Sequence, residues 1–133
     1  MRKSLSFLLL VGALSGCREP DWQIVDLPSS PSGAFDAEAR VLREGATLHI
    51  TRNGQPWSEY NWLALGQCSK ASFYWSDERT AVFAYDKAEV VYFVDEPSRW
   101  GGANVGICNR LTTTCPKPVS TVAQVPGCDD HSM

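Results

Sequence analysis

Five cysteines carry the clearest chemistry in this chain: Cys17 near the N-terminus, and Cys68, Cys108, Cys115 and Cys128 in the second half. Four cysteines in an oxidising compartment predict two disulfide bonds, with three connectivities open. We favour Cys68 with Cys108 and Cys115 with Cys128, because these bonds would tie the middle of the chain to its last strand and pin a proline-rich tail. No Cys-x-x-Cys occurs, so a thioredoxin-like redox site is not expected.

Acid–base chemistry has few candidates. His49 would need an orienting partner and a nucleophile within hydrogen-bond reach, and its neighbours Thr47 and Thr51 form no known dyad. Asp36 and Glu38 would lie about 7 Å apart on one strand face, and glycosidase carboxylates do lie about 5–9 Å apart, but such a pair also needs a cleft. We therefore interpret His49 as a solvent-facing strand residue and the two carboxylates as part of an exposed strand face. We expect no enzyme.

Metal-capable side chains gather only at the C-terminus, in Asp129-Asp130-His131. Chain ends are disordered by default, and a transition-metal site here would need further ligands from elsewhere. We expect neither a metal site nor a cofactor.

Aromatic residues are concentrated between positions 57 and 100. Most should belong to the core, because large aromatic side chains dominate core burial. Those beside predicted turns or loops can instead anchor a protein partner. The candidates for partner binding are Trp57, Tyr60, Trp62 and Trp100.

The N-terminal segment has the parts of a secretory signal. Arg2 and Lys3 form a basic end, residues 5–14 form an apolar stretch, and Ser15-Gly16 are small. The apolar stretch is too short to span a bilayer, which takes roughly 20 apolar residues. The segment therefore predicts export.

The sequence Leu14-Ser15-Gly16-Cys17 resembles the lipobox of bacterial lipoproteins. The resemblance implies cleavage before Cys17 and acyl chains on its sulfur and its amine; an ordinary signal cut after Gly16 is the alternative. Several acyl chains on one residue would make release from the membrane negligible, since each buried methylene contributes about 0.8 kcal/mol. In that family an aspartate directly after the acylated cysteine implies retention in the inner membrane. Arg18 has that position here, so the resemblance implies the outer membrane, with the domain facing the periplasm.

Charge excludes one class of partner. Of the 12 basic residues, Arg2 and Lys3 leave with the signal, so the mature chain carries 10 against 15 acidic residues, a net charge of −5. An acidic chain of this kind does not bind nucleic acid through its phosphates. The membrane, through the lipid, and a protein in the envelope are the expected partners.

Alternating apolar and polar residues predict the fold. The pattern from Phe35 to Val41 predicts a half-buried strand, and residues 47–51 predict its hairpin partner. Residues 71–76, 80–85 and 89–94 favour further strands; residues 57–67 fit a helical turn or a strand, and 95–107 a loop. The expected fold class is mainly β, a small antiparallel meander, sandwich or open barrel of about 5–7 strands, stapled by disulfides.

These elements divide the chain into a signal peptide (1–16), an acylated cysteine with a tether that can hold a short strand near its start (17–34), an antiparallel β domain (35–111) and an irregular, disulfide-pinned tail (112–133). The segments Ser30-Pro31-Ser32-Gly33 and Trp75-Ser76-Asp77 resemble pieces of small exported bacterial β proteins. A β-propeller shares such pieces but needs at least four blades of about 40–45 residues each. The resemblance implies no activity.

An anchored, acidic β domain with aromatic residues in its loops and no catalytic pattern predicts a membrane-anchored periplasmic lipoprotein that binds a protein without catalysis. An inhibitor or immunity-type protein is the concrete form of this hypothesis. The alternative is a structural or assembly accessory of the cell envelope.

Overall fold

Alternation of apolar and polar residues builds the hairpin at the centre of the first sheet. In the computed structural model, which describes residues 22–42, 45–57 and 62–125, β2 (Phe35–Leu42) and β3 (Gly45–Arg52) pair antiparallel along their whole length. Ala37 and Ala39 of β2 and Leu48 of β3 are buried in the core. The hairpin predicted from the sequence is confirmed.

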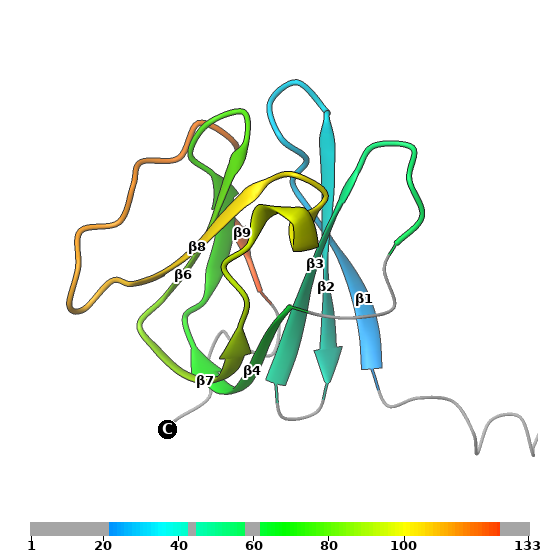
Figure 1. Cartoon of the computed structure of the whole chain (residues 1–133). Helices are drawn as coiled ribbons and strands as arrows, with labels where there is room; N and C mark the ends of the chain where they lie inside the picture. Colours follow the sequence, from blue (N-terminus) through cyan, green and yellow to red (C-terminus); the bar gives the residue numbers. More distant parts are fainter. Residues whose placement is uncertain (1–21, 43–44, 58–61, 126–133) are drawn as a thin grey trace, which may run out of the picture.

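Two sheets make up the domain (Figure 1). Sheet A has the strand order β1-β2-β3-β4-β7, and sheet B has the order β8-β6-β5-β9. The remaining elements are β1 (Trp22–Leu27), β4 (Leu63–Ser69), β5 (Ser72–Trp75), β6 (Thr80–Tyr85), β7 (Lys87–Phe93), a short 3-10 helix η1 (Pro97–Trp100), β8 (Asn104–Asn109) and β9 (Ala123–Gln124). The mainly β fold class is confirmed.

Strand pairing starts inside the segment expected to be a tether. β1 pairs antiparallel with β2, with Trp22 opposite Leu42 and Leu27 opposite Ala37. β1 is therefore an edge of sheet A, and the sheet includes part of the range 17–34.

A long hairpin crosses from one sheet to the other. β4 pairs with β7 in sheet A, and their continuations β5 and β6 pair in sheet B. The chain changes sheets at Lys70, which has a φ of 54°, and again at Asp86. For residues 57–67 a helix and a strand were both open; residues 63–67 belong to β4, and residues 58–61 lie outside the described part of the chain. β7 begins at Lys87, two residues before the predicted strand 89–94.

Two expectations about the last third of the chain are wrong. Residues 95–107 are not all loop, because β8 begins at Asn104. β8 pairs with β6 in parallel, so the sheets are not purely antiparallel. A parallel neighbour needs a long crossover connection, and residues 86–103, which include β7 and η1, supply it. With β8 and β9, the described residues form more strands than the sequence predicted.

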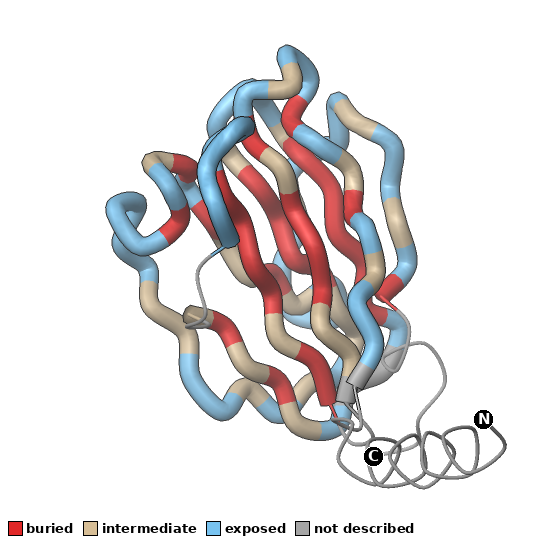
Figure 2. Tube along the Cα trace, turned by 90° about the vertical axis from the view of Figure 1, so that its right-hand side faces the viewer, coloured by how far each residue is buried: buried red, intermediate tan, exposed pale blue. Residues whose placement is uncertain are grey.

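The core lies between the two sheets, and Figure 2 shows buried residues along neighbouring strands. Trp75 is fully buried, stacks on Phe35 at 5.9 Å between ring centroids, and meets Phe73 edge-on at 5.8 Å. Its indole N–H donates to the carbonyl of Pro28 at 2.7 Å, so this aromatic side chain has its polar atom satisfied. Trp75 thus joins sheet B to the segment after β1 of sheet A.

Candidate functional site

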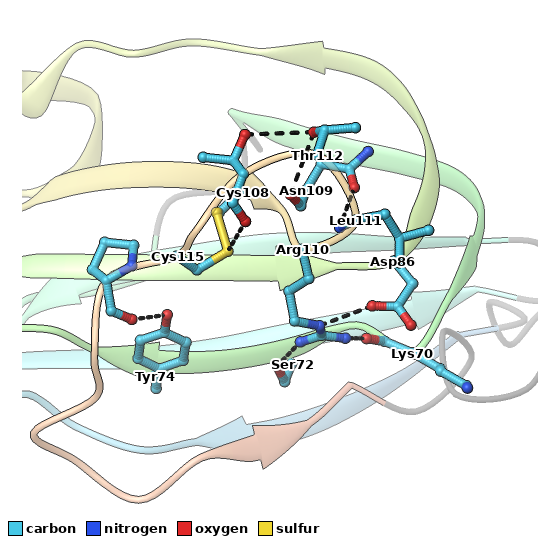
Figure 3. The surroundings of a disulfide bond; sticks show 12 residues. Lys70, Ser72, Tyr74, Asp86, Cys108, Asn109, Arg110, Leu111, Thr112 and Cys115 are labelled. Carbon is cyan, nitrogen blue, oxygen red and sulfur yellow. Dashed lines mark hydrogen bonds and ion pairs between the residues drawn. A yellow bond between two sulfur atoms is a disulfide. The ribbon is translucent and has the colours of Figure 1, made fainter.

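The disulfide in the structure is not one of the two that we favoured. Cys108, at the end of β8, is bonded to Cys115 in the segment that follows (Figure 3). Both proposed pairs, Cys68 with Cys108 and Cys115 with Cys128, are therefore wrong. The pairs were chosen for the segments that they would join, whereas the turn that follows β8 brings Cys115 back to Cys108, seven positions earlier in the chain. The side chain of Cys68 and all of Cys128 lie outside the described residues.

The segment after Cys115 lies along the outer face of sheet B. The hydroxyl of Tyr74 donates to the carbonyl of Pro116, and the backbone N–H of Val119 donates to the carbonyl of Trp75 at 2.8 Å. Cys115 packs against a small apolar cluster that includes Tyr74 and Val82, and burial raises the pKa of Tyr74. This tail therefore covers an apolar face that β5 and β6 would otherwise expose.

Arg110 fastens the corner where the chain changes sheets (Figure 3). Its Nε lies 2.9 Å from a carboxylate oxygen of Asp86, and its Nη1 donates to the hydroxyl of Ser72 at 2.8 Å. Its Nη2 donates to the carbonyl of Lys70. A planar guanidinium can serve several acceptors in fixed directions, so Arg110 holds three segments with one side chain and has a structural task.

The candidate acid–base residues Glu38 and His49 pair with other side chains of sheet A. Contrary to expectation, His49 and Glu38 are buried, although they project from the side of sheet A opposite the core residues Ala37 and Leu48. Glu38 forms an ion pair with Arg40 at 3.0 Å, and the Nε2 of His49 hydrogen-bonds the hydroxyl of Thr47 at 3.0 Å. These polar groups pair with one another along the face of sheet A.

Burial, with a smaller effect of the Arg40 charge, lowers the pKa of His49 to about 4. The imidazole is therefore neutral at neutral pH. Its Nδ1 is buried and has no hydrogen-bond partner among the described residues. Asp36 accepts a hydrogen bond from the hydroxyl of Ser29 at 2.9 Å. The hydroxyl on Nε2 of His49 is that of Thr47, two positions earlier on the same strand.

No group of three or more metal-capable side chains occurs among the described residues. Asp129, Asp130 and His131 lie outside them.

The aromatic candidates for partner binding separate into different environments. Trp100 is 1% exposed, and its indole N–H donates to the carbonyl of Val94 at 2.8 Å, so it belongs to the core and cannot be a surface anchor. Trp57, after β3, is at the surface with 36% exposure. Tyr60 lies outside the described residues. Trp62 is half-buried against the core.

Trp62 belongs to a surface that we call the aromatic rim, made of Trp62, Val91, Tyr92 and Arg99. The guanidinium of Arg99 lies over the Trp62 ring at 4.9 Å from its centroid. The N–H of Val94 donates to the carbonyl of Trp62 at 2.8 Å, which keeps the strand pairing of β4 and β7 running past Leu63. Tyr92 is opposite Ala64 on the adjoining strand. Three chain segments thus converge at the rim.

The rim also lies at a sheet edge. β7 ends the strand order of sheet A, and in the described part of the chain its sheet partner is β4. Val91 is 61% exposed and Tyr92 is 41% exposed on this edge strand. Edge strands can accept a further strand from another chain, and aromatic and arginine side chains are enriched in protein interfaces.

Sequence reasoning missed Val91, Tyr92 and Arg99. A usable signal was the run Val90-Val91-Tyr92-Phe93, in which four consecutive apolar residues break the alternation of a half-buried strand. Successive side chains of a strand point to opposite faces, so such a run must leave part of its apolar surface away from the core.

Two findings remain, one on membrane-spanning helices and one on comparisons with known proteins. Among the residues that the structure describes, no helix is long and apolar enough to cross a membrane, and Cys17 lies outside those residues. Comparisons with protein families, with curated proteins and with solved structures found no match for this chain.

Proposed function

We propose that this protein is a membrane-anchored lipoprotein of the cell envelope whose β domain binds a protein partner without catalysis, as an inhibitor or an immunity-type protein does. The observation that carries the proposal is the aromatic rim. Val91 and Tyr92 expose apolar surface on an edge strand, and Trp62, with Arg99 over its ring, is bonded through its carbonyl to the N–H of Val94, two residues after Tyr92. An extended partner segment would gain backbone hydrogen bonds from β7 and apolar contacts from these side chains.

The proposed location in the cell rests on the N-terminal sequence. Acylation at Cys17, after a cut at Gly16, would hold the domain at the periplasmic face of the outer membrane. With Cys17→Ala we expect the protein to leave the membrane fraction for the soluble periplasm. Retention of the Cys17→Ala variant in the membrane fraction at the wild-type level would contradict the anchor.

Binding is tested by photo-cross-linking in intact cells. A photoreactive amino acid replaces Val91 on the rim, and in a matched control it replaces Val119 on the tail, because both positions are 61% exposed. We expect one specific adduct of defined mass from position 91 and none from position 119. No adduct from position 91, or the same adducts from both positions, would overturn the proposal.

The same experiment separates the two kinds of partner. An inhibitor or immunity-type protein should form the adduct with one envelope-active protein, and its deletion should matter when that protein is present. A structural or assembly accessory should form the adduct with a stable membrane complex, and its deletion should impair the envelope under all conditions.

A further inference from the structure

β7 is the last strand of sheet A, and among the described residues it pairs only with β4 (Figure 1). The N–H of Val94 donates to the carbonyl of Trp62, so the neighbouring pair of Leu63 and Phe93 is of the non-hydrogen-bonded type. The backbone N–H and C=O of Phe93 therefore point away from β4, toward the free edge of the sheet. Backbone groups at such an edge can pair with a strand of another chain.

The side chains in the middle of β7 follow a pattern that reads the same in both directions. The register of β7 against β4 skips Val91, between Val90 and Tyr92, so Val91 is the extra residue of a β-bulge. Val90 and Phe93 pack against the core, whereas Val91 and Tyr92 between them are 61% and 41% exposed. This order is symmetric about the midpoint between Val91 and Tyr92. If two copies of the strand run antiparallel about that midpoint, core-packed residues meet core-packed residues and exposed residues meet exposed ones.

The charges at the two ends of β7 are of opposite sign. Lys87 is exposed at its start, and Asp95 and Glu96 are exposed just after its end. Glu96 has an extended backbone, with a φ of −144° and a ψ of 110°. Charged side chains usually protect an edge strand from pairing. Here a second copy that runs antiparallel brings the positive end of one strand to the negative end of the other.

We propose that two copies of this chain pair antiparallel through the free edges of β7, about a two-fold axis that passes between Val91 and Tyr92. Val91 of each copy then lies opposite Tyr92 of the other, and Lys87 lies opposite Glu96, next to Asp95. The two-fold axis repeats every contact, so one strand supplies both halves of the interface. The same edge is assigned to a protein partner in the proposed function, so that partner must displace the second copy. The dimer itself does not depend on that function.

The first test measures the mass of the purified full chain by sedimentation equilibrium over a range of concentrations. Cys17→Ala is included, so that no acyl chain requires detergent. We expect the mass to rise with concentration from one chain to two and no further, because a two-fold interface closes on itself. A mass of one chain at every concentration, growth beyond two chains, or a dimer that survives denaturing electrophoresis without reductant would overturn the proposal.

The second test reverses the charges of the proposed pair. Lys87→Glu and Glu96→Lys each place like charges opposite one another twice in the dimer, so each should weaken dimerisation by at least about tenfold. The double variant restores opposite charges and should dimerise as the wild-type sequence does. Lys117→Glu, the matched change of an exposed lysine on the tail, should have no effect.

Equal weakening by Lys87→Glu and Lys117→Glu, or no recovery in the double variant, would overturn the proposed register. The mass measurements contain no other protein. Their failure would therefore leave the cross-linking test of the partner unaffected, and failure of that test would leave the dimer unaffected.

Discussion

The two sheets bury the side chains of their outer faces in different ways. On sheet A, polar side chains of β2 and β3 face away from the core and pair with one another, as Glu38 does with Arg40 and His49 with Thr47. On sheet B, an apolar cluster around Tyr74 and Val82 is covered by the tail, which the Cys108–Cys115 bond ties down.

The difference shows two ways in which a sheet can bury side chains on the face that points away from the main core. Polar groups can be buried when they are hydrogen-bonded to each other, and apolar groups can be covered by the chain's own irregular segment. The polar face of sheet A should respond to protonation of its side chains, and the covered face of sheet B should respond to reduction of the disulfide. Four predictions use this contrast, in order of expected effect.

Acid should destabilise the face of sheet A through His49. The unfolded chain binds a proton on this imidazole near pH 6.5, whereas the folded chain binds it near pH 4. Stability is therefore lost as the pH falls from 6.5 to 4, by up to about 3 kcal/mol. Urea unfolding between pH 4 and 7.5 should show a shallower pH dependence for His49→Gln than for wild type.

The control is His131→Gln, which replaces the other histidine of the chain. It should keep the wild-type pH dependence. A pH dependence that is identical in wild type and His49→Gln would show that the imidazole is not held neutral in the folded protein.

Removal of the Cys108–Cys115 bond should loosen the face of sheet B. A closed loop of this length contributes about 2.5 kcal/mol by restricting the unfolded chain. Cys108→Ser with Cys115→Ser should lower the free energy of unfolding by about that amount, without changing its pH dependence below pH 6.5. Chemical denaturation measures both, and a changed pH dependence would show that the two faces are coupled.

Arg110→Lys should weaken the corner between the sheets. A lysine keeps the charge near Asp86 but cannot serve Ser72 and the carbonyl of Lys70 at the same time. We expect a loss of about 1–2 kcal/mol from the hydrogen bonds removed. Arg79→Lys, in the exposed turn before β6, is the control and should be neutral within about 0.5 kcal/mol.

Val91→Ser on the aromatic rim should change the stability by less than about 0.5 kcal/mol, because this side chain lies outside the core. The same variant should abolish the cross-link formed from a photoreactive group at Tyr92. Val119→Ser, equally exposed on the tail, should leave that cross-link intact. Unchanged cross-linking in Val91→Ser would remove the rim from the proposed interface.

The elements that were predicted correctly are those set by local patterns. The alternation from Phe35 to Val41 and the strand formers from Thr80 to Tyr85 both appear as strands. The first pattern is that of a strand with one face on the core, and the second, an apolar run, is that of a strand buried on both faces. Short pieces such as β8 and β9 were missed, because a strand of two or six residues with polar ends is held by its neighbours rather than by its own pattern.

The candidate surface was predicted only in part. Trp62 is half-buried and Trp57 is at the surface, whereas Trp100 is packed in the core. A residue beside a loop can point either way, and η1 turns Trp100 inward, where Phe93 meets it at 6.4 Å between ring centroids. Exposure of Val91 and Tyr92 depends on the position of β7 at the edge of sheet A, which no local pattern encodes.

The sequence by itself determined the mainly β class and the β2–β3 hairpin, because these follow from side-chain alternation and apolar surface. Only the tertiary structure decided the Cys108–Cys115 pairing, the parallel pairing of β6 with β8 and the burial of His49. Each of these depends on which distant segments become neighbours, and residue types along a single strand leave that choice open.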